Sequence, residues 1–243
     1  MSNPTAAMLV IGDEILSGRT RDSNMHFLAG ELTKTGIDLR EARIVSDHAY
    51  SIVAALNDLR GTYDHVFTSG GIGPTHDDIT ADCIAAAFGV SINVRDDARK
   101  ILADRYEKMG TELNEARLRM ARIPAGATLI ENPVSGAPGF SIGNVHVMAG
   151  VPAVFQAMVA SVLPHLAGGA PLVSQSLRVN RPEGDIAGPL TVLAEEFPEL
   201  SLGSYPFIQN GAYGSNIVIR GSDGAQVNAA IMKLAALFPD GTE

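Results

Sequence analysis

The first part of the chain alternates short apolar runs with segments that are apolar on one side only. Residues 6–12, AAMLVIG, form a continuous apolar run of strand length. Residues 23–36 then place Phe27, Leu28 and Leu32 on one face of a helical pattern that a glycine ends. This order predicts a buried strand followed by a helix that packs on it.

The same order occurs twice more. Residues 37–45 and 63–69 have strand patterns, and helical patterns over 49–61 and 79–89 follow them, each ending at a glycine. Parallel strands need helical crossovers, and right-handed crossovers place helices on the faces of a sheet. The pattern predicts an α/β fold with three layers, in which a parallel or mixed sheet has helices on both faces.

The rest of this domain is less regular. Residues 96–122 form a helical excursion, and a strand-like segment over 140–150 follows it. A helix is expected over 151–168, with Pro152 in its first turn, where a missing N–H costs nothing. We assign residues 1–168 to this first domain.

A second, smaller domain is expected over residues 172–243. The segment GGAP at 168–171 has the composition of a linker. Beyond it the patterns follow the order strand, helix, strand, strand, helix. This order predicts a small α+β unit whose helices lie on one face of a short sheet.

Composition and charge restrict the ligands of the protein. The 243 residues are 46% hydrophobic, which is enough for real cores, and the formal net charge is −9. This negative charge opposes nucleic acid and anionic membranes as partners. Any anionic ligand must therefore be bound by local groups.

The lone cysteine and the N-terminus indicate a cytoplasmic protein. A single Cys83 excludes an internal disulfide framework and a cysteine-rich zinc site, and fits a reducing compartment. The N-terminus has no basic region before its apolar run, and that run stops at Gly12, Asp13 and Glu14, far short of a membrane span.

The stretch TSGGIGPTHDDIT, residues 68–80, is the strongest candidate for a ligand site. It follows a predicted strand and opens a helix, which is where open α/β sheets bind ligands. Gly70, Gly71 and Gly73 have no Cβ, so backbone N–H groups can approach phosphate oxygens, and a helix N-terminus adds roughly +0.5 of an elementary charge. The hydroxyl of Thr75 offers another donor.

Two aspartates in this glycine loop call for a cation or for a structural role. Asp77 and Asp78 would repel a phosphate unless Mg²⁺ lay between them, because this hard ion accepts carboxylate and phosphate oxygens together. The alternative is that one of them caps the following helix.

Further acidic residues follow the other predicted strands. Asp13 and Glu14 come after the first strand and should emerge at the same sheet edge as the glycine loop, which makes a divalent site plausible. Asp13 could instead cap a turn, and Asp47 could be the N-cap of a helix. The segment NPVSGAPG, residues 132–139, is either a second backbone cradle or an ordinary turn.

Several of these stretches resemble one known family. GDEILSG, SD at 46–47, TSGGIGPTHDDIT, NPVSGAPGF and GVP at 150–152 occur in the order typical of the MoaB/Mog-like molybdopterin-binding fold. The chain is most similar to the N-terminal part of competence/damage-inducible protein A (CinA), and the resemblance covers nearly all of it. The second domain resembles the small KH-like module of that family, although its acidic balance and lack of a basic G-x-x-G clamp argue against RNA binding.

The resemblance implies specific roles. In molybdopterin adenylyltransferases of this fold the glycine loop ends in Arg-Asp, and the Asp helps to position Mg²⁺ and the nucleotide; Asp78 matches it, whereas Asp77 replaces the Arg. This change resembles the CinA branch, to which ADP-ribose pyrophosphatase activity is attributed, and a related FAD-hydrolysing domain of some FAD synthases. Asp47 matches another acidic position of the family's active site. The sequence departs from the family at Ser135 and Gly136, where Gly and Thr are usual, and it lacks the C-terminal amidase domain of full-length CinA.

The expected function is that of a metal-dependent nucleotide pyrophosphatase acting on ADP-ribose or a similar dinucleotide. The alternatives are a molybdopterin-binding or molybdopterin-adenylylating protein and a non-catalytic module of the same fold. Family members are commonly dimers or trimers, so a homo-oligomer is expected.

The site residues are expected to divide by role. Asp78 and Asp47 are the expected catalytic residues. Phosphate or nucleotide binding is expected of Ser69, Gly70, Gly71, Gly73, Pro74, Thr75, Gly136, Pro138 and Gly139. A divalent metal such as Mg²⁺ is expected to bind Asp77, Asp78, Asp13 and Glu14.

Overall fold

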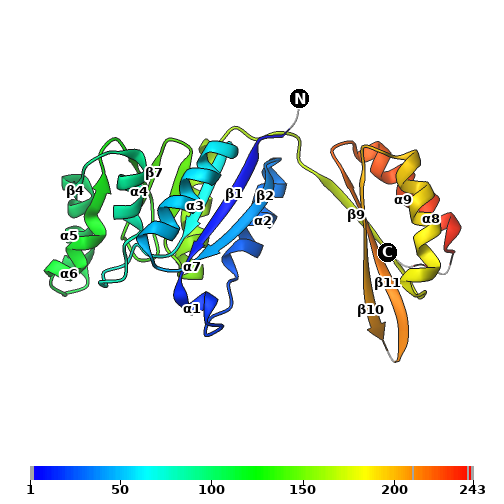
Figure 1. Cartoon of the computed structure of the whole chain (residues 1–243), viewed down its shortest axis with the longest axis horizontal. Coiled ribbons are helices and arrows are strands. Elements are labelled where there is room, and N and C mark those ends of the chain that lie inside the picture. Colours follow the sequence, from blue (N-terminus) through cyan, green and yellow to red (C-terminus); the bar gives the residue numbers. More distant parts are fainter. Residues whose placement is uncertain (1–2, 210, 240, 242–243) are drawn as a thin grey trace. The chain divides into compact units, whose positions relative to one another are not determined.

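The computed structural model describes residues 3–209, 211–239 and 241. The chain divides into two compact units, residues 1–169 and 170–243, which are described separately (Figure 1). Within the described residues, no helix is both long and apolar enough to cross a bilayer.

The first unit is built on a six-stranded mixed sheet with the strand order β2-β1-β3-β8-β7-β6. Pairing is parallel from β2 through β1 and β3 to β8, and antiparallel between β8, β7 and β6. The four parallel strands therefore end at one edge of the sheet, which confirms the predicted mixed α/β sheet. The strands are β1 (Thr5–Ile11), β2 (Asp38–Val45), β3 (His65–Ser69), β6 (Thr128–Ile130), β7 (Gly139–Ile142) and β8 (Val145–Met148).

The antiparallel part corrects one prediction. Residues 140–150 do not form one strand, because the chain reverses at Gly143 and Asn144 to make a hairpin of β7 and β8. Gly143 has φ +57°, a value that favours glycine. The Asn144 side-chain amide donates to the carbonyl oxygens of Arg60 (3.0 Å) and Tyr63 (2.9 Å), so the turn is tied to the end of the helix that precedes β3.

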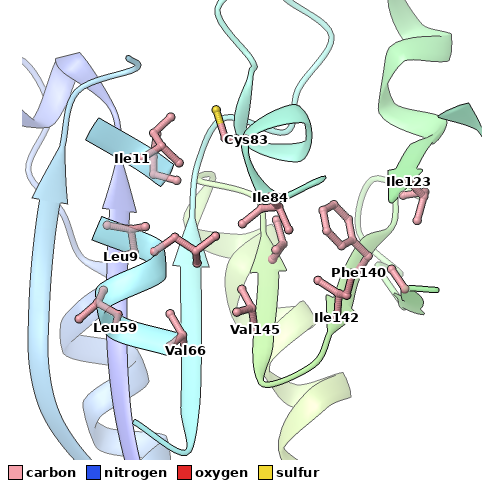
Figure 2. Packing of buried hydrophobic residues seen from close by; sticks show 14 of the residues in the cluster. Leu9, Ile11, Leu59, Val66, Cys83, Ile84, Ile123, Phe140, Ile142 and Val145 are labelled. Carbon is pink, nitrogen blue, oxygen red and sulfur yellow. The ribbon is translucent and has the colours of Figure 1, made fainter. Parts of the chain in front are cut away.

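Helices cover both faces of this sheet, as predicted, because successive residues of β1 point to opposite sides. Ala7, Leu9 and Ile11 belong to a buried cluster with residues of α3, α4 and α5, and Figure 2 shows part of it. Ala6, Met8 and Val10 belong to a second cluster with residues of α2 and α7. The helices are α2 (Asn24–Thr35), α3 (Ala49–Thr62), α4 (Thr80–Phe88), α5 (Asp96–Lys108) and α7 (Pro152–Val162). The first turn of α7 contains Pro152, as expected.

The excursion after α4 is helical, as predicted, and also contains a small sheet. After α5 come the short helix α6 (Glu115–Leu118) and the 3₁₀ turn η1 (Arg119–Ala121). The strands β4 (Ile92–Val94) and β5 (Arg122–Pro124) pair antiparallel, and only three residues of each take part, which is too few for a pattern to reveal. This sheet brings η1 back toward the start of α4. The remaining short elements are α1 (Asp13–Leu16) and η2 (Leu163–His165).

The second unit has the predicted order of strand, helix, strand, strand and helix. Its three antiparallel strands have the order β10-β11-β9, and both helices pack through one buried cluster that includes Leu177, Ile186, Ile217, Ile219 and Leu234. The elements are β9 (Val173–Val179), α8 (Glu183–Glu196), β10 (Ser201–Gln209), β11 (Ala212–Gly221) and α9 (Gly224–Leu237). This is a small α+β unit; its KH-like character stays an expectation.

Candidate functional site

The glycine loop leaves the end of β3 and folds back on the start of α4 in a conformation that requires glycine. Gly70 (φ +107°) and Gly71 (φ +68°) have left-handed backbones. A Cβ on Gly70 would lie 2.2 Å from the carbonyl oxygen of Ile11, and one on Gly71 would lie 2.1 Å from Oγ1 of Thr80. Thr80 closes the loop, since its N–H donates to Gly71 O (2.9 Å) and its hydroxyl to Gly70 O (3.0 Å).

Asp78 shapes this loop and does not cap the helix. Its Oδ2 accepts hydrogen bonds from the N–H (2.8 Å) and the hydroxyl (2.6 Å) of Thr75. The N-cap of α4 is Ile79 and no side chain caps it, so the interpretation of Asp77 or Asp78 as a helix cap is wrong. The Thr75 hydroxyl, expected to donate to a phosphate, donates to Asp78 instead. Gly73 leaves room for the Asp78 carboxylate, which would lie 2.6 Å from a Cβ there.

Asp47 joins the ends of two strands. Its Oδ2 accepts a hydrogen bond from the backbone N–H of Asp13 at 2.9 Å, across 34 residues of chain. The N-cap of α3 is His48, and no side chain caps that helix, so Asp47 is not the N-cap. Asp13 itself does not cap a turn through its side chain, since α1 begins at Asp13 after Gly12 without a side-chain cap.

The carboxyl group of Asp47 is less acidic than an ordinary aspartate. Burial raises its pKa, and the negative charges of Asp13, Glu14 and Asp77 raise it further, whereas the hydrogen bond from the Asp13 N–H acts in the opposite direction. Acidic groups that follow three different strands are therefore close enough to interact. A raised pKa makes Asp47 a better proton acceptor than an unperturbed aspartate.

These segments surround a cleft of about 690 Å³. Of the residues expected to form the site, the cleft is lined by Glu14, Asp47, Gly70, Gly71, Gly73, Asp77 and Asp78. Asp13 is exposed and lies outside the lining, as do Pro74, Thr75 and Gly136. Ser69 lines a smaller adjoining hollow and Pro138 another. Gly139 is a buried residue of β7, where a Cβ would lie 2.4 Å from Val147 O.

The carboxylates of the cleft do not form a complete metal-binding site by themselves. Among the described residues, no group of three or more His, Cys, Asp or Glu side chains is placed to hold a metal ion. Mg²⁺ commonly binds one or two carboxylates, several waters and the phosphates of a substrate. The hard carboxylate oxygens of the cleft therefore fit a cation that arrives with a phosphate ligand, not one held by the protein alone.

Asn24 is a site residue that the sequence reading missed. This side chain is only 3% exposed, and its amide donates to the Ser69 hydroxyl (2.9 Å) and to the Gly150 carbonyl oxygen (2.8 Å). A carbonyl oxygen only accepts, so the orientation of this amide is determined. Asn24 thus ties the end of β3 to the loop before α7, from the first turn of α2. In sequence it looks like an ordinary helix start.

Asn132 holds the second loop, residues 132–139, in shape through hydrogen bonds within the loop. Its Oδ1 accepts from the N–H groups of Val134 and Ser135 (both 3.1 Å), and its amide donates to the Ser135 hydroxyl (2.5 Å) and to Ala137 O (2.8 Å). Asn132, Ser135 and Ala137 line the cleft. This loop therefore forms one wall of the cleft, although Gly136 and Gly139 do not line it, and its role as a second backbone cradle stays a prediction.

Comparison with known proteins assigns both units. Residues 7–168 match the family described as "Probable molybdopterin binding domain", and residues 171–243 match "FAD synthase, middle domain". A "Probable FAD synthase" of Caenorhabditis elegans is 33% identical over 259 residues, covering 96% of this chain and 50% of that protein. This chain thus spans half the length of that relative.

Two other similar proteins come from archaea. A protein of Pyrobaculum calidifontis is 33% identical over 252 residues, covering 97% of this chain and 96% of its own. The crystal structure of the protein CinA from Thermoplasma acidophilum, described as of unknown function, is 35% identical with a TM-score of 0.61, and covers 67% of this chain and 97% of its own.

Proposed function

The chain belongs to the MoaB/Mog-like family of probable molybdopterin binding domains, and on that premise we propose that it is a metal-dependent nucleotide pyrophosphatase acting on ADP-ribose or a similar dinucleotide. One observation carries the proposal. Asp47, whose pKa is raised, shares a single cleft with the glycine loop and with Glu14, Asp77 and Asp78. A proton acceptor, a backbone cradle and ligands for a cation are what hydrolysis of a diphosphate needs.

In this proposal the glycine loop binds the diphosphate. Gly70, Gly71 and Gly73 line the cleft, so a ligand there can reach the main chain of the loop, and the N-terminus of α4 adds positive potential. When bound together with its phosphate ligand, a divalent cation would be held by one or two of the cleft carboxylates, which are those of Glu14, Asp77 and Asp78, and would neutralise charge on the phosphates and on the attacking water.

Asp47 acts as the general base. Its carboxylate takes a proton from a water whose oxygen bonds to one phosphorus, and the bridging oxygen leaves that phosphorus with the bonding electrons. Two monophosphates result, one of them AMP if ADP-ribose or FAD is the substrate. Asp78 positions the loop through Thr75, so it acts on the ligand through the loop as well as through the cation.

The test is direct. The full chain is incubated with ADP-ribose or FAD and with Mg²⁺, Mn²⁺ or Co²⁺, and AMP is measured by chromatography. We expect AMP release that Asp47→Asn lowers by at least about 100-fold, as is typical of a lost general base. His76→Gln is the matched control, because His76 lies on the same loop with a side chain that is 98% exposed. The proposal fails if the wild type releases no monophosphate from any dinucleotide with any of these ions.

A second candidate is binding or adenylylation of molybdopterin. The family match over residues 7–168 favours it, and Asp77, at a position where adenylyltransferases of this fold carry Arg, opposes it. Saturable binding of a pterin by calorimetry, together with no dinucleotide hydrolysis, would favour this second function over the first.

A further inference from the structure

A small hollow lies beside the glycine loop on the side of η1. It has a volume of about 20 Å³ and shares Ile72, Gly73, Asp78 and Met120 with the large cleft, so the two spaces adjoin at the loop. A volume of this size admits one water or one phosphate oxygen. Two arginines, Arg119 and Arg122, line the hollow.

The two arginines differ in their partners. Both terminal nitrogens of Arg122 donate to the carboxylate of Asp82, at 2.6 and 2.8 Å, so that charge is balanced. Arg119 makes one long contact, 3.4 Å from Nη2 to the carbonyl oxygen of Asp78. Among the described residues, its buried Nε has no hydrogen-bond partner and no carboxylate oxygen lies within 4.0 Å of its nitrogens.

Arg119 thus has an unused donor beside the glycine loop. Burying a donor without a partner is unfavourable, and an anionic ligand that accepts a hydrogen bond from it removes this cost. The Asp78 carboxylate does not serve, since it accepts the two hydrogen bonds from Thr75. The glycine loop itself, GGIGPTHDDI over 70–79, contains no lysine or arginine.

We propose that Arg119 binds a phosphate group of the ligand and supplies the positive charge that the glycine loop lacks. This inference rests on the proposed function for the identity of the ligand as a diphosphate. The planar guanidinium presents several N–H donors that match phosphate oxygens, and its Nε is the donor left over in this structure. In this proposal the helical excursion of residues 96–122 contributes to ligand binding, because it places Arg119 beside the glycine loop.

Calorimetric titration of inorganic pyrophosphate into the full chain tests the proposal. We expect Arg119→Gln to weaken binding by about 10- to 100-fold, as for loss of a charged hydrogen bond, and Arg119→Lys to restore part of the affinity. Arg99→Gln is the matched control, because Arg99 is an exposed residue of α5 on the same excursion, and its affinity should stay within about twofold of the wild type.

A second measurement avoids substitutions that could disturb folding. Phenylglyoxal modifies guanidinium groups, and mass spectrometry of the wild type reports which arginines react. We expect pyrophosphate to slow the modification of Arg119 and to leave that of Arg99 unchanged. Equal reaction of Arg119 with and without pyrophosphate, or equal pyrophosphate affinity of a folded Arg119→Gln variant, overturns the proposal.

The two proposals fail in different ways. If pyrophosphate binds through Arg119 and no dinucleotide is hydrolysed, the proposed hydrolysis is wrong and the phosphate site remains. If the wild type hydrolyses dinucleotides and Arg119→Gln changes neither hydrolysis nor pyrophosphate affinity, the role of Arg119 is wrong and the hydrolysis remains. A wild type that binds no pyrophosphate at millimolar concentration overturns the Arg119 site in either case.

Discussion

The pKa of Asp47 makes its proposed role testable at the scale of single residues. A general base must be deprotonated, so hydrolysis should rise with pH as Asp47 loses its proton. Because burial and the charges of Asp13, Glu14 and Asp77 raise that pKa, we expect the acidic limb of the kcat/KM profile to lie above the ordinary aspartate value of 3.8. Asp13→Asn should shift the limb toward lower pH, since it removes one of the repelling charges and Asp13 does not line the cleft. A limb that does not move in this variant would contradict the electrostatic explanation.

Asn24 offers a second prediction at this scale. Asn24→Ala removes one buried and one partly buried hydrogen bond and leaves the Ser69 hydroxyl and the Gly150 carbonyl without that donor. We expect the free energy of unfolding to fall by about 2 kcal/mol, measured by urea denaturation. Asn57→Ala is the control, because Asn57 is an exposed asparagine on α3 of the same unit, and its loss should cost about 0.5 kcal/mol or less. Equal losses of unfolding free energy in the two variants would show that the hydrogen bonds of Asn24 do not contribute more to stability than those of an exposed asparagine.

At the scale of elements, the glycine loop requires glycine mainly because other atoms approach its backbone closely, and less because of its positive φ angles. Gly71 and Gly18 both have positive φ, +68° and +72°, but a Cβ on Gly71 meets Thr80 whereas one on Gly18 meets nothing within 4 Å. Gly18→Ala should therefore cost only the left-handed strain, about 1–2 kcal/mol. Gly71→Ala should cost several kcal/mol more or distort the loop, because the clash adds to that strain. Thermal unfolding and pyrophosphate binding measure both effects, and equal costs would contradict this account.

The turns and caps of the elements were where sequence reasoning failed. The apolar runs located the strands because each must bury side chains on the sheet, and this requirement is local. The hairpin at Gly143 and Asn144 was missed because its two strands together have the length and apolar content of one. Asp47 and Asp78 looked like helix caps, since a cap and a loop clamp use the same residue type; only their contacts, with Asp13 and with Thr75, distinguish the two roles.

At the scale of the whole molecule, one buried histidine couples folding to pH. His146 is 5% exposed in the sheet, with Nδ1 2.9 Å from the Ser141 hydroxyl, and burial lowers its pKa from 6.5 to about 4. The unfolded chain therefore binds a proton below pH 6.5 that the folded protein does not bind until about pH 4. Stability should fall over this window as pH decreases, by roughly 3 kcal/mol from this group, and should not depend on it above pH 6.5.

The control for this prediction is another histidine. His146→Gln should flatten the pH dependence of the unfolding free energy between pH 6.5 and 4, whereas His76→Gln should leave it unchanged, because His76 is exposed on the glycine loop. The comparison between variants matters, since the many carboxylates titrate at the acidic end of the same window. The prediction would be contradicted if the unfolding free energies of the wild type and His146→Gln had the same dependence on pH.

The sequence by itself determined the α/β architecture of residues 1–168, the strand and helix order of the second unit, and the family. These follow from hydrophobic periodicity and from a motif of contiguous residues, which are local properties of a chain. Only the tertiary structure decided which side chains face the cleft. Asp47 meets Asp13 across 34 residues, Asn24 reaches Gly150, and Arg119 reaches Asp78. Such contacts depend on how distant strand ends and an irregular excursion are placed in space, and no local pattern encodes that placement.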